Sequence, residues 1–92
     1  MRSTVVSLVT PHLLRIVDLA NDAEKAINVD WHVRDAVAKT MQELGEQYNA
    51  SALVASYIEG LESAAGQAVR TRVAYVGVLQ AAAAAARNLR RD

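Results

Sequence analysis

The two histidines are the side chains best suited to acid–base or metal chemistry. His32 lies between Asp30 and Asp35, so these three side chains could together touch a metal ion. All three are also ordinary residues for the start of a helix, where acidic side chains are favoured. No His-Glu-x-x-His motif accompanies His12 or His32, and no third ligand stands at helical spacing. The sequence therefore predicts no metal site.

Other catalytic motifs are missing as well. No histidine is placed by sequence to activate a serine, and no strand–turn–helix elbow surrounds one. Gly60 and Gly66 lie within a helical pattern, whereas a phosphate-binding loop follows a strand. Cysteine is absent, which excludes disulfides and thiolate metal sites. We expect a protein that is not an enzyme, with no catalytic residue and no cofactor.

Charge and hydropathy exclude further classes of partner. Ten basic residues balance ten acidic ones, so no global field attracts nucleic acid or a membrane surface. Arg87, Arg90 and Arg91 complement the dipole of a C-terminal helix, with an acidic partner or a weak phosphate contact as alternatives. Residues 73–86 are too short to span a bilayer, and 5–9 are too short for a signal core. We expect no nucleic-acid partner, no membrane insertion, and a cytoplasmic protein or one secreted without a cleaved signal peptide.

The C-terminal half carries the strongest structural pattern. Residues 49–91 lack proline, are rich in alanine, and repeat apolar or small residues at steps of four and three. We call these positions the seam: Val54, Ile58, Leu61, Ala65, Ala68, Arg72, Tyr75, Leu79, Ala82, Ala86 and Leu89. Roughly 40 helical residues form a rod about 60 Å long, against a radius of gyration of about 12 Å for a compact chain of this size. The pattern predicts a long third helix over residues 50–90 that must lie along partner helices.

The N-terminal half predicts an arm and two shorter helices. Residues 1–9 are expected to form a short arm that pairs as a strand or joins the next helix. Thr10 and Pro11 favour a helix start, so the first helix should cover 10–27. Residues 28–30 should end that helix, with the chain either reversing or only kinking there, and the second helix should cover 30–48. The prediction is one all-α domain over 1–92, an elongated helical hairpin or three-helix bundle.

Three further features bear on binding. A small-residue ladder at spacing four lets another backbone come close, or simply fills an alanine-rich helix; its members are Ala52, Ser56, Gly60 and Ala64. Arg72 is the charged residue of the seam and should either reach solvent or pair with Asp18, Glu24 or Asp35. Trp31 should be buried at the helix junction, with a role as an exposed partner anchor as the alternative.

The opening Val9-Thr10-Pro11-His12-Leu13-Leu14-Arg15, followed by Ala20 and Ala23, resembles the first helix of the Esp-C-like branch of the WXG-type, ESAT-like proteins of type VII secretion. The resemblance implies a small all-helical hairpin that is a secretion substrate. No Trp-x-Gly turn occurs here, because His32 and Val33 follow Trp31. A Tyr-x-x-x-Asp/Glu signature is also absent. No export-signal residue is therefore carried over, and a partner or targeting chaperone of such a system fits the sequence better.

These patterns lead to an expected function of helical protein–protein interaction. A homo- or hetero-oligomer should form through the seam of the third helix, at Val54, Ile58, Leu61, Ala65, Ala68, Tyr75 and Leu79. The first hypothesis is a type VII secretion substrate or its partner. The alternative is a small regulatory binder, antitoxin-like or an anti-activator, that masks its target by helix-in-groove contact.

Overall fold

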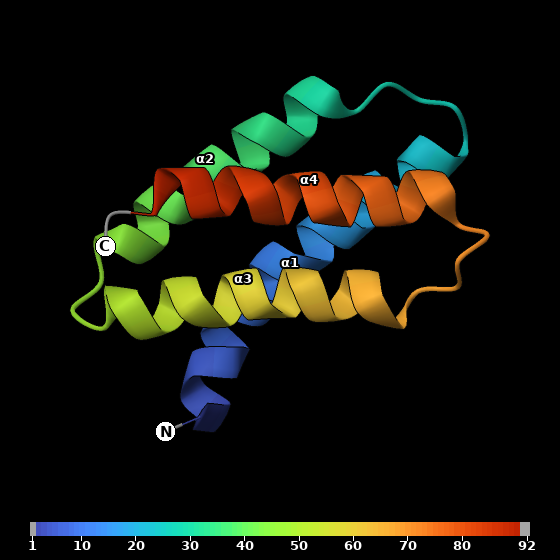
Figure 1. Cartoon of the computed structure of the whole chain (residues 1–92). Helices are drawn as coiled ribbons and strands as arrows, with labels where there is room; N and C mark the ends of the chain where they lie inside the picture. Colours follow the sequence, from blue (N-terminus) through green and yellow to red (C-terminus); the bar gives the residue numbers. More distant parts are fainter. Residues whose placement is uncertain (1, 91–92) are drawn as a thin grey trace.

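The chain folds into four α-helices that all contact one another. The computed structural model describes residues 2–90, and the side chains of residues 4–90. The helices are α1 (Arg2–Glu24), α2 (Asp30–Gly45), α3 (Ala50–Gln67) and α4 (Val73–Leu89) (Figure 1). Figure 1 shows α4 between α2 and α3, with α1 crossing behind it. Within the described range no residue is in a strand, which confirms the all-α class.

The dimensions of the molecule contradict the expected rod. The Cα radius of gyration is 12.6 Å, and the principal extents are 39 × 24 × 20 Å. A compact chain of this length has a radius of about 12 Å. The expected single helix over 50–90 is wrong, because α3 ends at Gln67 and α4 begins at Val73. The elongated three-helix arrangement is therefore replaced by a compact four-helix bundle.

The break between α3 and α4 follows from burial in the chain's own core. Folding back places Leu61 of α3 and Leu79 of α4 in the same cluster, each at most 1% exposed. Burying a leucine side chain stabilises a fold by about 1.5–3 kcal/mol. A straight helix in a lone chain would leave such residues in water. The seam is thus covered by the protein's own helices.

α1 starts earlier than the sequence predicts. Helix begins at Arg2, so the described part of the expected arm belongs to α1, and Pro11 lies inside the helix. Thr10 does not cap the helix, because its hydroxyl donates to the carbonyl of Val6 at 2.7 Å. Val9 is fully buried, and this burial favours a helix that continues through Pro11. It does so although proline removes a backbone donor there and costs about 3 kcal/mol.

The turn from α1 to α2 is a full reversal. α1 ends at Glu24, three residues before the expected end, and Ala26 takes the left-handed conformation at φ 64°. Amides of Ala26 and Ile27 donate to the carbonyls of Ala23 and Asp22, at 3.1 and 3.4 Å. This is the bond pattern of a Schellman motif with alanine at the position usually held by glycine. α2 then runs back along the bundle (Figure 1) and ends at Gly45 instead of residue 48.

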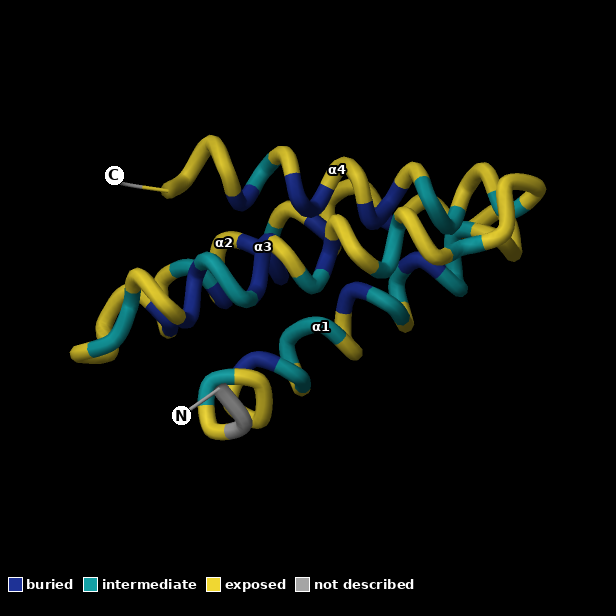
Figure 2. Tube along the Cα trace, turned by 60° about the horizontal axis from the view of Figure 1, so that its bottom comes forward, coloured by how far each residue is buried: buried dark blue, intermediate teal, exposed yellow. Residues whose placement is uncertain are grey.

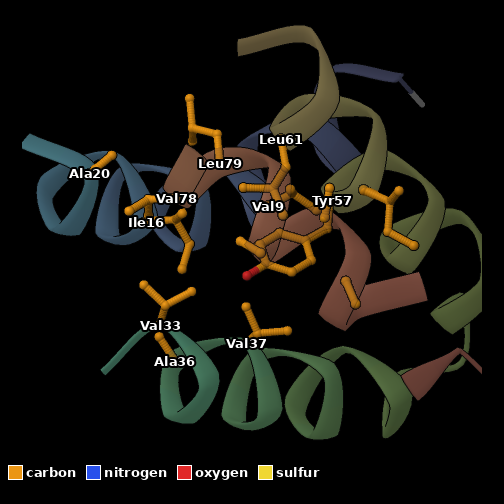
Figure 3. Packing of buried hydrophobic residues seen from close by; sticks show 14 of the residues in the cluster. Val9, Ile16, Ala20, Val33, Ala36, Val37, Tyr57, Leu61, Val78 and Leu79 are labelled. Atoms are coloured by element: carbon orange, nitrogen blue, oxygen red, sulfur yellow. The ribbon is translucent and has the colours of Figure 1, made fainter. Parts of the chain in front are cut away.

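Apolar residues from all four helices form one core. Tyr57 is its largest fully buried side chain and lies close to Val9 and Leu61 in Figure 3; Ile16, Leu53, Ile58 and Leu79 belong to the same cluster. Many of the other core residues are valine or alanine. The helices therefore pack closely, and the bundle is thin.

Candidate interaction surface

The expected interface residues lie mostly inside the molecule. Val54, Ile58, Leu61 and Leu79 are buried, and Ala65, Ala68 and Tyr75 are half-buried. Because α1, α2 and the rest of the α3–α4 pair already cover the seam, it is not available as the partner surface that the periodicity predicts. The seam identifies the core.

The small-residue ladder marks a close approach within the chain. A Cβ on Gly60 would lie 2.7 Å from Cδ1 and 3.0 Å from Cδ2 of Leu13 on α1. Ser56 and Ala64 are half-buried on the same helix, whereas Ala52 is exposed. Gly60 thus makes room for the Leu13 side chain of α1, whereas the close approach of another backbone along this ladder stays a prediction.

Arg72 is not buried with the apolar residues of the seam and instead joins the start of α4 to the end of α1. Its Nε and Nη2 donate to the Glu24 carboxylate at 2.6–3.2 Å, and Nη2 also donates to Asn21 Oδ1 at 2.9 Å. The guanidinium carbon lies 3.8 Å from the centre of the Tyr75 ring. Hydrogen bonds from Arg72 lower the pKa of Glu24. Pairing with Glu24, one of the expected alternatives, is what the structure contains.

Among the described side chains, Thr40, His12 and Glu43 form the arrangement closest to one for acid–base chemistry. Thr40, 3% exposed, shares a hydrogen bond of 3.2 Å with His12 Nδ1, and His12 Nε2 lies 3.7 Å from Glu43 Oε2. Burial raises the pKa of Tyr57 to about 12, offset slightly by the nearby Thr40 hydroxyl. The Thr40 hydroxyl lies close enough to Tyr57 to lower this pKa but is hydrogen-bonded to His12, so by geometry Tyr57 Oη is the one buried polar atom among the described side chains with no hydrogen-bond partner. Glu43, His12 and Thr40 thus stand in the order acid, imidazole and hydroxyl. Because the Thr40 hydroxyl is buried, no substrate could reach it as a nucleophile.

An open surface lies along α4. Figure 2 shows one side of α4 exposed over the whole helix while the opposite side is buried. We call seven of its exposed residues the α4 outer face: Val73, Ala74, Gly77, Gln80, Ala81, Ala84 and Asn88. None of the seven carries a charge, and most are alanine, glycine or valine; the other exposed residues of α4 are Leu89 and Arg87, which pairs with Glu62 at the edge of this face. A partner backbone could therefore come close to α4 along its length.

Grooves flank this face on both sides. The groove between α2 and α4 has a volume of about 630 Å³ and includes Val33, Ala74 and Gly77. Two smaller grooves of about 410 Å³ each lie between α3 and α4 and are lined by Ala65 and Gly66, among others. Gly77 lines grooves on both sides of α4. The α4 outer face is thus a low ridge between two troughs.

Four large apolar side chains stand exposed at the end where the α1–α2 and α3–α4 turns lie together (Figure 1). They are Ile27, Trp31, Val69 and Val73. Trp31 is 70% exposed and packs edge-to-face on His32, with ring centroids 5.3 Å apart. The expected burial of Trp31 is therefore wrong, and its alternative role as a partner anchor stays a prediction. Exposed aromatic anchors of this kind are typical of binding surfaces.

No protein-family model, no curated protein and no solved structure matches this chain. The described residues contain no helix long and apolar enough to cross a membrane. They also contain no group of three or more histidine or acidic side chains arranged to hold a metal, so His32, Asp30 and Asp35 do not form one. The α4 outer face is therefore the candidate site on geometry alone.

Proposed function

We propose that the protein is a non-enzymatic interaction module that binds a helix of another protein along the α4 outer face. The observation that carries this proposal is Gly77. It lies in the middle of α4, where glycine costs about 1 kcal/mol relative to alanine. Beyond its chain neighbours and the backbone of its own helix, no atom lies within 4 Å of a Cβ built there, so no contact with another element explains the glycine.

A helical partner fits the shape of this surface. A helix laid on the low ridge at Gly77 and Ala81 would place larger apolar side chains into the grooves on either side. Val73, at the N-terminal end of α4, is 74% exposed and would become buried in such a complex. Ile27, which is 50% exposed, lines the α2–α4 groove and would also be covered by the partner, whereas Trp31 lies outside the groove lining.

The resemblance at residues 9–15 supports type VII secretion as the setting, with the protein as a substrate or as its partner or targeting chaperone. A regulatory binder that masks a toxin or an activator would use the same face. The identity of the bound protein separates the two settings.

Site-specific photo-crosslinking in the native host tests the proposal. A photoreactive side chain at Ala81, on the α4 outer face, should give a discrete crosslinked product that excess unlabelled protein competes away. The same probe at Arg15, which is exposed on α1, is the matched control and should give none. Equal products from both positions, or no specific product from Ala81, would contradict binding along α4.

A further inference from the structure

The segment between α3 and α4 contains no residue that forces a helix to end. We call residues 68–72 the hinge; their sequence is Ala-Val-Arg-Thr-Arg, without glycine or proline. Ala68 leaves the helix at φ −72°, ψ 149°, and Arg72 lies at φ −86°, ψ 61°, so both keep a negative φ. Gly66, just before the hinge, also keeps a negative φ. Contacts elsewhere in the molecule bend the chain here, and local chemistry does not.

The seam also keeps its phase across the hinge. Leu61 and Ala65 on α3 are followed at regular steps of three and four by Ala68, Arg72, Tyr75 and Leu79. Two helices joined by a loop need no common phase, because the loop sets their rotation. A continuous helix does need it, since its apolar stripe must stay on one side. The sequence is therefore compatible with α3 and α4 as one uninterrupted helix.

We infer that the hinge straightens in a second state, in which two copies of the chain exchange α4. Each α4 would then occupy, on its partner, the place it holds here, and would bury the same Val78, Leu79 and Ala82. Exchange of an identical element keeps these contacts and is a general route to dimers. The Arg87–Glu62 ion pair between α4 and α3, 2.7 Å long, would form between chains.

Exposed valines at the hinge favour a second copy as the occupant. Val69 is 63% exposed, and Val73, the first residue of α4, is 74% exposed. In an exchanged dimer the two hinges lie next to each other at the two-fold axis, so these side chains would cover one another. The exchange does not depend on binding at the α4 outer face, which beyond Val73 stays open in both states.

The experiment measures the distance between the two ends of the α3–α4 unit within one chain. Cysteines at exposed Ala52 and Asn88 would carry spin labels, since the chain has no cysteine of its own. In the closed chain both positions lie at the same end of the bundle (Figure 1), within a molecule whose longest extent is 39 Å. A continuous helix would separate them by about 54 Å. Labelled protein is refolded at millimolar concentration with excess unlabelled protein, so that only distances within one chain are read.

Two substitutions at Val69 make the test specific. Ala68 already has the extended conformation preferred before proline, so Val69→Pro fits the closed hinge. In a continuous helix the same proline removes a hydrogen bond and clashes with the preceding turn, which should lower the dimerisation constant at least about 100-fold. Val69→Ala removes the same side chain and permits helix, so it is the matched control.

The inference predicts a dimer in size-exclusion chromatography with light scattering, and a long distance in that fraction. Val69→Ala should keep this dimer and Val69→Pro should lose it. A protein that stays monomeric after refolding, with the short distance alone, would overturn the exchange. A dimer that keeps the short distance, or one that Val69→Pro does not reduce, would also overturn it and would indicate association of closed chains.

Discussion

Replacing Gly77 by alanine should stabilise the protein. Alanine in the middle of a helix is favoured over glycine by about 1 kcal/mol. The added methyl group on Gly77 would have no atom of a neighbouring element within 4 Å, so no steric term reduces that gain. For a domain of this size a gain of about 1 kcal/mol corresponds to a rise in Tm of roughly 4–8 °C. Urea denaturation followed by the helical circular dichroism signal measures the change, with the slope expected to stay constant.

Gly60→Ala is the matched control for this prediction. It has the same helix-propensity gain, but its methyl group would lie 2.7 Å from Leu13 Cδ1. Leu13 must then shift, and displacing a packed side chain typically costs about 1–3 kcal/mol. The free energy of unfolding of Gly60→Ala should therefore fall below that of Gly77→Ala by roughly 1–3 kcal/mol. The reasoning is refuted if Gly77→Ala destabilises the protein, because something would then occupy the α4 outer face, or if both variants gain equally.

Further predictions concern single positions elsewhere in the bundle. Ala26→Gly should raise the free energy of unfolding by about 1 kcal/mol in thermal melts, because glycine adopts the left-handed conformation at φ 64° without the Cβ penalty; unchanged stability would argue against that turn. Tyr57→Phe should add about 1 kcal/mol by removing a buried hydroxyl without a partner, and a loss of stability would indicate a missed hydrogen bond. Since burial raises the pKa of Tyr57 from 10.0 to about 12, the unfolded state ionises first, and stability should fall as pH rises through this window in the parent but less in Tyr57→Phe. Hydrogen bonds from Arg72 lower the pKa of Glu24 below 4.5, so the contribution of this pair to stability is present above that value and is lost as pH falls through the lowered pKa. Glu24→Gln should therefore speed amide exchange in residues 68–72 at neutral pH. Unchanged exchange would exclude a role for Glu24 in restraining that segment.

Periodicity identifies the helices and much of the core from the sequence alone. Val54, Ile58, Leu61 and Leu79 follow the seam and are all buried. Their spacing fixes which side of the helix is apolar, and the hydrophobic effect then places that side inward. Spacing does not distinguish burial against another protein from burial against the same chain.

The break after Gln67 could not be read from the sequence, because it depends on a distant contact. Arg72 meets Glu24, 48 residues earlier in the chain, and the segment between the helices has no glycine or proline to mark a turn. Pro11 misled in the opposite direction, since proline near a threonine resembles a helix start. Burial of Val9 outweighs that local preference and extends α1 to Arg2.

The candidate surface could not be singled out for a similar reason. α4 carries two stripes of apolar or small residues at helical spacing. One runs through Leu79 and Ala82, and the other runs through Gly77 and Ala81. Alanine and glycine are tolerated both inside and outside a fold, so composition does not tell which stripe faces the core. The glycines at 66 and 77 are the available signal, since glycine inside a helix costs about 1 kcal/mol relative to alanine.

Affinity for the crosslinked partner tests the central claim most directly. Gly77→Leu places a large side chain on the α4 outer face, where no atom of a neighbouring element lies within 4 Å of its Cβ, and should weaken binding at least about tenfold, which is 1.4 kcal/mol. Gly45→Leu, at an equally open glycine near the end of α2, should bind as the parent does. Titration calorimetry on these two folded variants would support binding along α4 if only Gly77→Leu loses affinity. Equal affinities for Gly77→Leu and the parent would contradict it.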